Sequence, residues 1–377
     1  MRNIIYILIF FGSRLFSQEP VFSDFYNNPI YLNPALAGQY QIRASFNANN
    51  QWYNIPGQLN TQTFSLDGSL STKKWTDVPN PVELILGMYV LNNHEGELGM
   101  KFNDYSLLLG TKFTKSNHSL SIPIQLAYVT KQLDLSNAVF MQNLDPVFGN
   151  IYTSNFIRTS LNRSHIDFHS GFNYSYINRI KSYDSKLDFG IAFHNLIGTH
   201  RDGFLSHNAV NRLKTTIYFS FLKKGLGLIG DLRFSGFYQR QVNQQTVQFS
   251  SHIFPNFGNM GNGRTFLGTG IFFRQQFLNT SLVSDPTLSF ETIYFPLFIL
   301  LRKKEYIFRF SFSHGFCVSE LAGGNPGGIG EITLLIIKNS DNHWDFCPGD
   351  KQVRNELSKK QKKGRNKLNK RRNRVIR

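Results

Sequence analysis

The sequence has no apolar run long enough to cross a membrane as a helix. Beyond residue 17 the longest candidate is Ile293–Leu301, which spans nine residues and contains Pro296. A membrane-spanning helix needs about 20 mostly apolar residues, and proline disrupts a helix interior. Helical spans therefore do not hold the mature chain in a membrane.

Motifs of common active sites are also missing. There is no Gly-x-Ser-x-Gly, His-Glu-x-x-His, Cys-x-x-Cys or Gly-Lys-Ser/Thr pattern. The densest group of metal-ligand residue types is His94, Glu95 and Glu97, in a stretch that resembles a hairpin turn and offers no evident further ligand. The glycine run 323–328 precedes a strand-like segment, which favours a loop over a nucleotide site. We predict no enzyme activity, no cofactor and no metal site.

The first residues have the pattern of a secretory signal peptide. Arg2 gives a positive start, and residues 4–12 form a short apolar stretch. We expect residues 1–17 to be the signal, with cleavage after Ser17; the alternative is an N-terminal membrane anchor. The chain is therefore expected to leave the cytoplasm.

Aromatic residues are abundant, yet the mean hydropathy is −0.26. The two facts are compatible because apolar and polar residues alternate in several segments, among them 121–128, 167–176 and 306–313. Period-two alternation predicts strands with one apolar and one polar face. Clusters rich in Gly, Asn and Ser predict turns or loops at 92–96, 116–119, 256–263 and 323–328.

An exported, strand-rich chain of this length fits a transmembrane β-barrel, or a soluble sandwich or propeller. A barrel needs strands of about 9–11 residues with apolar-out, polar-in alternation and aromatic girdles. No internal repeat of fixed length is visible, which argues against a propeller. The pattern favours an all-β, antiparallel barrel of the bacterial outer membrane.

The formal net charge of +17 is concentrated at the C-terminus. Residues 351–377 carry thirteen Lys or Arg and one Glu, which leaves about +5 for residues 1–350. We expect a disordered basic tail facing the periplasm. It is either solvated without a partner or attached to an acidic periplasmic protein or anionic lipid. Export argues against nucleic acid as its partner.

The sequence contains two cysteines, Cys317 and Cys347. Export first suggests a disulfide. A strand over 306–316, a loop over 319–328 and a last strand over 330–339 would instead place the two thiols near opposite rims of a barrel. That separation exceeds disulfide geometry, so we predict two unpaired thiols.

The most specific pattern lies near the N-terminus. It comprises Phe22-Ser23, Asn28-Pro29, Leu32-Asn33-Pro34-Ala35, Gly38, Gln51-Trp52, Ile55-Pro56-Gly57 and Asp67. This pattern resembles the start of the PorP/SprF family of type IX secretion outer-membrane proteins. Weaker likeness follows in order at 87–96, 166–172, 188–196, 327–332 and at Phe346-Cys347-Pro348.

The resemblance implies a barrel of fourteen strands within residues 18–350 and a non-enzymatic role in type IX secretion and gliding motility. The implied partners are outer-membrane lipids, a periplasmic ring or peptidoglycan-associated components, and a secreted surface protein with a type IX C-terminal signal. The alternatives are a passive porin for small solutes and a soluble secreted adhesin. Family members usually end soon after the Cys-Pro pair, so the basic tail is a departure.

The family-signature residues have a structural or partner-facing role. They are Pro29, Leu32, Asn33, Pro34, Gly38, Trp52, Pro56 and Gly57. Pro29 and Pro34 remove amide donors and fix φ, which suits a rigid irregular segment better than a barrel strand. We hypothesise that residues 20–38 enter the barrel lumen or follow its periplasmic rim as a partial plug; alternatively they only begin and seal the first strands. Trp52 is expected beside a tight turn at the membrane interface.

Overall fold

A computed structural model describes residues 22–54, 57–71, 82–96, 99–115, 117–135, 144–145, 149–150, 160–180, 183–197, 212–223, 231–242, 244–254, 264–278, 292–303, 306–318 and 327–338. Several features predicted from sequence lie outside these residues: the signal peptide, Pro56, Glu97, the loop 256–263, residues 323–326, Cys347 and the basic tail. The predicted state of the two thiols is therefore not tested.

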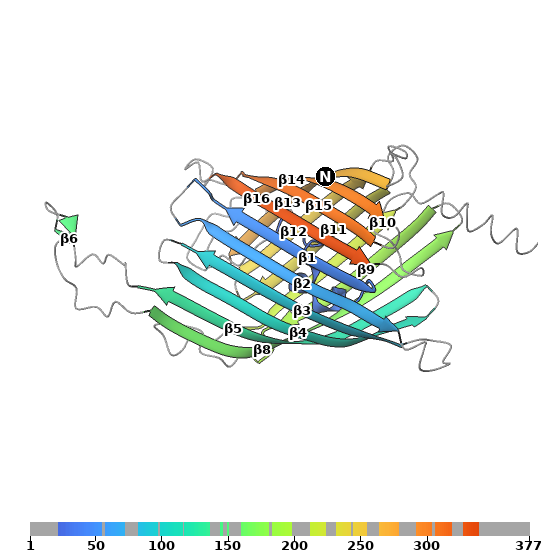
Figure 1. Cartoon of the computed structure of the whole chain (residues 1–377), viewed down its shortest axis with the longest axis horizontal. Helices are drawn as coiled ribbons and strands as arrows, with labels where there is room; N and C mark the ends of the chain where they lie inside the picture. The colour runs from blue at the N-terminus through green and yellow to red at the C-terminus, as the bar shows by residue number, and fades with distance from the viewer. Residues whose placement is uncertain are drawn as a thin grey trace, which may run out of the picture.

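Fourteen antiparallel strands close into one barrel (Figure 1). They are β1 (Ile42–Gln51), β2 (Leu59–Ser71), β3 (Val82–Glu95), β4 (Met100–Lys115), β5 (His118–Asp134), β8 (Ser160–Ile180), β9 (Tyr183–His194), β10 (Lys214–Lys223), β11 (Asp231–Gln241), β12 (Gln244–Phe254), β13 (Arg264–Leu278), β14 (Thr292–Lys303), β15 (Tyr306–Cys317) and β16 (Gly328–Lys338). Strand β1 pairs with β16 and closes the wall. Two short strands, β6 (Leu144–Asp145) and β7 (Gly149–Asn150), form a separate pair. The prediction of a fourteen-stranded barrel is confirmed.

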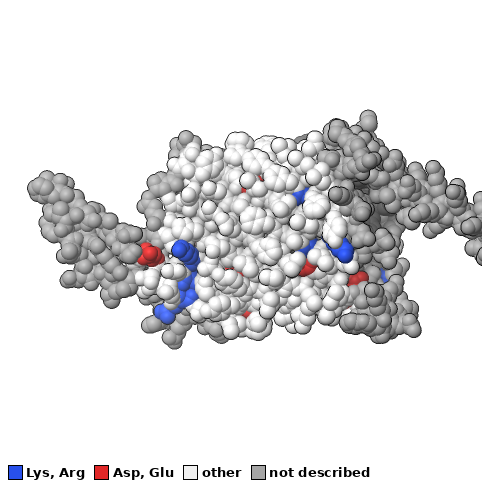
Figure 2. Space-filling view, viewed as in Figure 1, with Lys and Arg blue, Asp and Glu red and all other residues white. Residues whose placement is uncertain are grey.

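Side chains alternate between the lumen and the outer surface, as the sequence pattern predicted. In β15, Tyr306, Phe308 and Phe310 are exposed, whereas Ile307 and Arg309 are buried inside. On the face in Figure 2, few charged side chains lie across the middle of the wall, and most of those visible lie towards its two ends. An apolar outer band around a largely polar interior is typical of a transmembrane barrel.

Several predicted turns are shorter than their sequence clusters. Strand β3 continues to Glu95 and β5 begins at His118, so most of 92–96 and 118–119 are strand. Asn93 faces the lumen, where it accepts a hydrogen bond from Thr61 Oγ1 at 2.7 Å. Polar residues were misread as a turn signal there because a barrel interior uses the same residue types.

Two prolines interrupt the strand ladders. Pairing between β5 and β8 is interrupted around Pro123 and resumes at Ile124. Pairing between β13 and β14 is likewise interrupted around Pro296 and resumes at Tyr294, because proline has no N–H to donate. A hydroxyl on the neighbouring strand donates to each proline carbonyl: Ser170 to Pro123 at 2.9 Å, and Thr269 to Pro296 at 3.0 Å. The apolar run 293–301 is part of β14.

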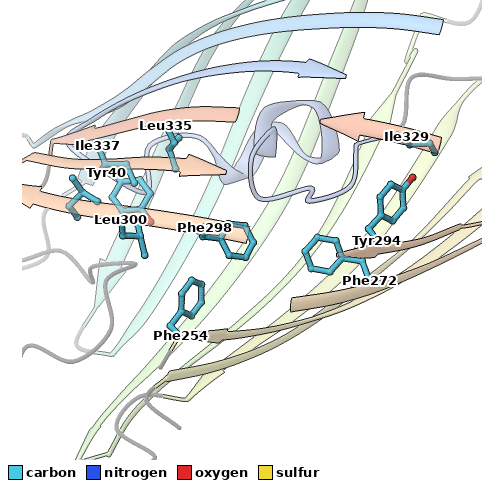
Figure 3. Packing of buried hydrophobic residues seen from close by; sticks show 10 residues of the cluster. Tyr40, Phe254, Phe272, Tyr294, Phe298, Leu300, Ile329, Leu335 and Ile337 are labelled. Carbon is cyan, nitrogen blue, oxygen red and sulfur yellow. The ribbon is translucent and has the colours of Figure 1, made fainter. Parts of the chain in front are cut away.

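Part of the inner wall is apolar and forms the main core. Inward-facing residues of β12–β16 cluster there with Tyr40. Figure 3 shows Tyr40 beside Leu300, with Phe298 above Phe254. Tyr40 precedes β1, so this cluster packs the start of the barrel against its last strands.

In the residues that the structure describes, the helical segments are two short turns, α2 (Pro29–Leu32) and η1 (Pro34–Leu36). Within the described part of the chain, no helix has the length and apolar character needed to cross a membrane.

Candidate functional site: the lumenal plug

Residues 22–38, here called the plug, lie inside the barrel (Figure 1). The two prolines begin its helical turns, since proline at the first helical position needs no amide partner. Asn33 separates the turns and accepts a hydrogen bond from Ala35 N at 2.8 Å. The observed position supports the plug alternative over a segment that only seals the first strands.

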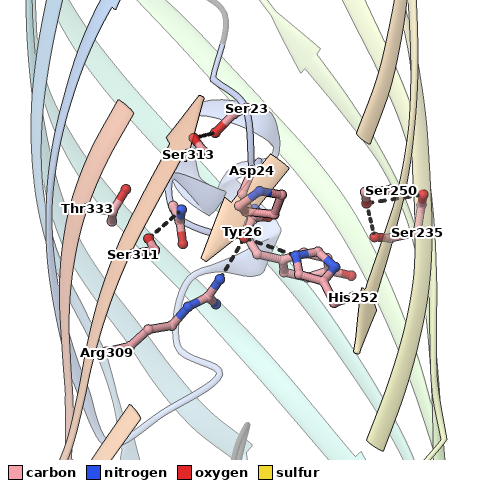
Figure 4. A network of polar contacts seen from close by, with 12 residues as sticks. Ser23, Asp24, Tyr26, Ser235, Ser250, His252, Arg309, Ser311, Ser313 and Thr333 are labelled. Carbon is pink, nitrogen blue, oxygen red and sulfur yellow. Dashed lines mark hydrogen bonds and ion pairs between the residues drawn. The ribbon is translucent and has the colours of Figure 1, made fainter. Parts of the chain in front are cut away.

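Asp24 is the electrostatic centre of the plug (Figure 4). Its Oδ2 accepts hydrogen bonds from Arg309 Nη2 at 2.7 Å and from His252 Nε2 at 3.2 Å. All three side chains are at most 2% exposed. Its other oxygen accepts a hydrogen bond from Tyr26 N. One carboxylate thus joins the plug to β12 and β15.

Two effects oppose each other at the Asp24 carboxyl. Burial raises its pKa, while His252 and Arg309 lower it and prevail, so the pKa of Asp24 is held well below its usual value. Asp24 is therefore ionised at neutral pH, and the contact with Arg309 is an ion pair.

The wall also binds the main chain beside Asp24. Glu331 Oε2 accepts from Ser23 N at 2.5 Å, and Gln248 Nε2 donates to Ser23 O at 2.6 Å. Ser45 Oγ donates to Asn27 O at 2.6 Å. Four elements of the wall (β1, β12, β15 and β16) therefore converge on residues 23–27.

Asn33 contacts the opposite side of the lumen. Its Nδ2 donates to the carbonyl oxygens of Phe172 on β8 and Ile191 on β9, at 3.2 and 3.4 Å. A Cβ on Gly171 would lie 2.0 Å from Asn33 Oδ1, and one on Gly190 would lie 2.9 Å from Asn33 Nδ2. The two glycines leave the room that Asn33 occupies.

Gly171→Ala should therefore displace Asn33 and loosen the plug. We expect a loss of about 1–3 kcal/mol, the usual range for an overpacked interior. Urea unfolding of the purified protein, followed by heat-modifiable gel mobility, measures it. Gly330→Ala is the matched control, because a Cβ there meets nothing within 4 Å; equal stability of the two variants would contradict the prediction.

A second buried ion pair, between β1 and β2, holds the end of the plug. Asp67 on β2 accepts from Arg43 Nε at 2.8 Å and from Gly38 N at 2.8 Å. Arg43 Nη2 also donates to Leu36 O at 3.0 Å. Gly38 has φ +67, and a Cβ there would lie 2.8 Å from Ile85, so glycine is required at this bend.

Five of the predicted signature residues come together in the lumen: Pro29, Leu32, Asn33, Pro34 and Gly38. Trp52 and Gly57 lie instead between β1 and β2, both with positive φ. Trp52 N donates to Gly328 O at 2.9 Å, which ties that turn to β16. The predicted role of Trp52 at the membrane interface stays a prediction, and Pro56 lies outside the described residues.

Sequence reasoning missed the wall partners of the plug, namely Arg309, His252, Gln248 and Glu331. Each occupies an inward position of a strand, but so do many other polar residues. His94 and Glu95 are neighbours on β3; His94 is exposed, while Asn93 donates to Glu95. Across the described ranges, no three His, Cys, Asp or Glu side chains gather as metal ligands would.

Comparisons with known proteins place the chain in a family. No curated protein sequence matches it. Among solved structures, the TodX monoaromatic hydrocarbon channel covers 83% of this chain and 94% of its own, at 10% identity and a TM-score of 0.45. The β domain of the Bordetella autotransporter BrkA covers 80% and 99%, at 8% identity and a TM-score of 0.36. The model of the type IX secretion system membrane protein PorP/SprF matches residues 15–336. The chain therefore belongs to the PorP/SprF family of type IX secretion system membrane proteins.

Proposed function

We propose that this protein is a non-enzymatic component of the type IX secretion and gliding-motility machinery in the outer membrane. In this role it helps to secrete a surface protein or to hold it at the cell surface. The family match supports the secretion role, and the barrel supports the outer-membrane location. The observation that carries the proposal beyond the family is the plug.

The plug favours this role over that of a passive porin. Its contacts extend around the lumen, from Thr63 on β2 through Ile191 on β9 to Arg309 on β15. A chain segment held on several sides obstructs the route that a small solute would take. A barrel whose lumen is obstructed in this way is better suited to binding partner proteins than to free diffusion of small solutes.

The topology supports an orientation for these partners. The three longest connections, 135–159, 195–213 and 279–291, all join strands at the same rim. The start of β1 and the end of β16 lie at the opposite rim. Outer-membrane barrels have short periplasmic turns and longer outer loops. We therefore place the secreted surface protein at the long-loop rim.

The opposite rim would then face the periplasm. The basic tail beyond residue 350 would reach the periplasmic ring or peptidoglycan-associated components. Export by cleavage of residues 1–17 is part of the same proposal.

An in-frame deletion tests the proposed role. We expect one or more proteins with type IX C-terminal signals to disappear from the cell surface and culture fluid, as measured by quantitative proteomics. Loss of one or a few would indicate a dedicated partner, and loss of all would indicate a core component. Unchanged fractions, with ion conduction by the purified protein in planar bilayers, would favour a porin instead.

A further inference from the structure

The wall around residues 22–28, here called the tip of the plug, recognises a peptide backbone. Glu331 and Gln248 bind the main-chain N–H and C=O of Ser23, and Ser45 binds the carbonyl of Asn27. Main-chain groups are common to all peptides. These three wall residues would therefore bind any segment that adopts the same backbone shape.

The same wall adds side-chain selectivity. Arg309 and His252 hold the carboxylate of Asp24. The two following residues of the tip are aromatic: Phe25 packs edge-on against Phe237, and the Arg233 guanidinium lies 4.4 Å from the centre of the Tyr26 ring. The wall thus matches an acidic residue followed by two aromatic residues. We call nine wall residues that contact residues 23–27 of the tip the socket: Ser45, Arg233, Phe237, Gln248, His252, Arg309, Ser311, Ser313 and Glu331.

The remainder of the plug, residues 29–38, is held differently and is called the root. Ile30 and Ala37 pack in an apolar cluster with Ile85, Leu91 and Leu108. The tip is held by polar contacts and by the packing of Phe25 and Tyr26 with Tyr218 and Phe237. A neutral hydrogen bond contributes only about 0.5–1.5 kcal/mol net because water replaces it. A segment with the same acidic and aromatic residues restores the ion pair and the aromatic packing, so the tip can exchange with it while the apolar packing retains the root.

We propose that the socket is a peptide-binding site, which the tip of the same chain occupies in this structure. When the tip withdraws, the socket takes a segment of a partner protein in which an acidic residue precedes aromatic residues. The site adds to the proposed secretion role and does not depend on it.

Binding of a synthetic peptide tests the proposal. The probe is a fluorescein-labelled peptide of residues 20–30, titrated against purified protein in detergent and followed by fluorescence anisotropy. We expect Asp24→Asn, which weakens the tip, to bind the probe at least about 10-fold more tightly than the unchanged protein. The same peptide with Asn in place of the Asp should bind that variant at least about 10-fold more weakly. Each tenfold step corresponds to about 1.4 kcal/mol.

Two further variants control the experiment. Asp24→Asn combined with Arg309→Gln should lose the preference for the acidic peptide. Asp104→Asn neutralises another acidic residue of the barrel, one that contacts Ser106 outside the socket, and should leave probe binding at the level of the unchanged protein. The proposal is overturned if folded Asp24→Asn binds the acidic peptide no better than the unchanged protein does, or binds both peptides equally.

Hydrogen exchange tests withdrawal of the tip without any substitution. We expect amides of residues 22–28 to exchange faster than those of residues 29–38. Equal exchange of tip and root, at the rate of the barrel strands, would also overturn the proposal. Because both experiments use purified protein, their failure would leave the proposed secretion role standing.

Discussion

Asp24→Ala should destabilise the barrel by about 3–5 kcal/mol, the usual cost of removing one partner from a buried ion pair. Arg309 would remain 2% exposed, stacked on the Phe298 ring at 4.2 Å, without the carboxylate that compensates its charge. Urea unfolding at neutral pH, read by heat-modifiable mobility, measures the change.

Combining Asp24→Ala with Arg309→Met is the control. Replacing both members of a buried pair by uncharged groups is often close to neutral, so the double variant should recover much of the loss. If Asp24→Ala alone stays within about 1 kcal/mol of the unchanged protein, the ion pair does not anchor the plug.

The pH dependence of the same variant follows from the lowered pKa of Asp24. The unfolded carboxyl binds a proton near its ordinary pKa of 3.8, whereas the folded one resists it to lower pH. The stability that the ionised Asp24 carboxylate gives the folded protein is therefore complete above pH values near the unfolded pKa. This stability is lost as the pH falls through the folded pKa. The stability difference between the unchanged protein and Asp24→Ala should accordingly shrink in strong acid.

Arg43→Met should have an effect of similar size, about 3–5 kcal/mol, for the same physical reason. Asp67 has a fully buried side chain and would retain Gly38 N as a donor, but it would lose both Arg43 contacts. Leu36 O would lose its donor as well. The same unfolding assay applies, and faster exchange of the residue 36 and 38 amides should accompany the loss.

Lys112→Met is the matched control for Arg43→Met. Lys112 pairs with Glu83 at 3.1 Å and donates a long hydrogen bond to Gly38 O at 3.4 Å. Both side chains of the pair are 10–13% exposed, so water can partly replace these contacts. We expect a loss of about 1 kcal/mol or less, as for most accessible ion pairs. Equal losses of unfolding free energy in Arg43→Met and Lys112→Met would show that burial of the ion pair does not determine the cost of removing one partner.

Much of the wall could be predicted because its pattern is local. Each strand must present apolar side chains to lipid and a different set to the lumen, so residues 121–128 and 306–313 show their alternation without reference to the rest of the chain. Turn boundaries were less reliable, since Asn93 inside β3 has the composition of a loop residue. The N-terminal motif identified the family and most of the plug, because Pro29, Asn33 and Pro34 have strong local effects on the backbone.

The partners of the plug were decided only by closure of the barrel. Arg309 lies 285 residues from Asp24, and His252 lies 228 residues from it. No local pattern marks either residue, because lumenal positions are polar on most strands. The sequence by itself determined the strands, the apolar outer band and the rigid shape of the N-terminal segment. The tertiary structure decided which carboxylate meets which arginine, since only pairing of β1 with β16 brings distant strands around one lumen.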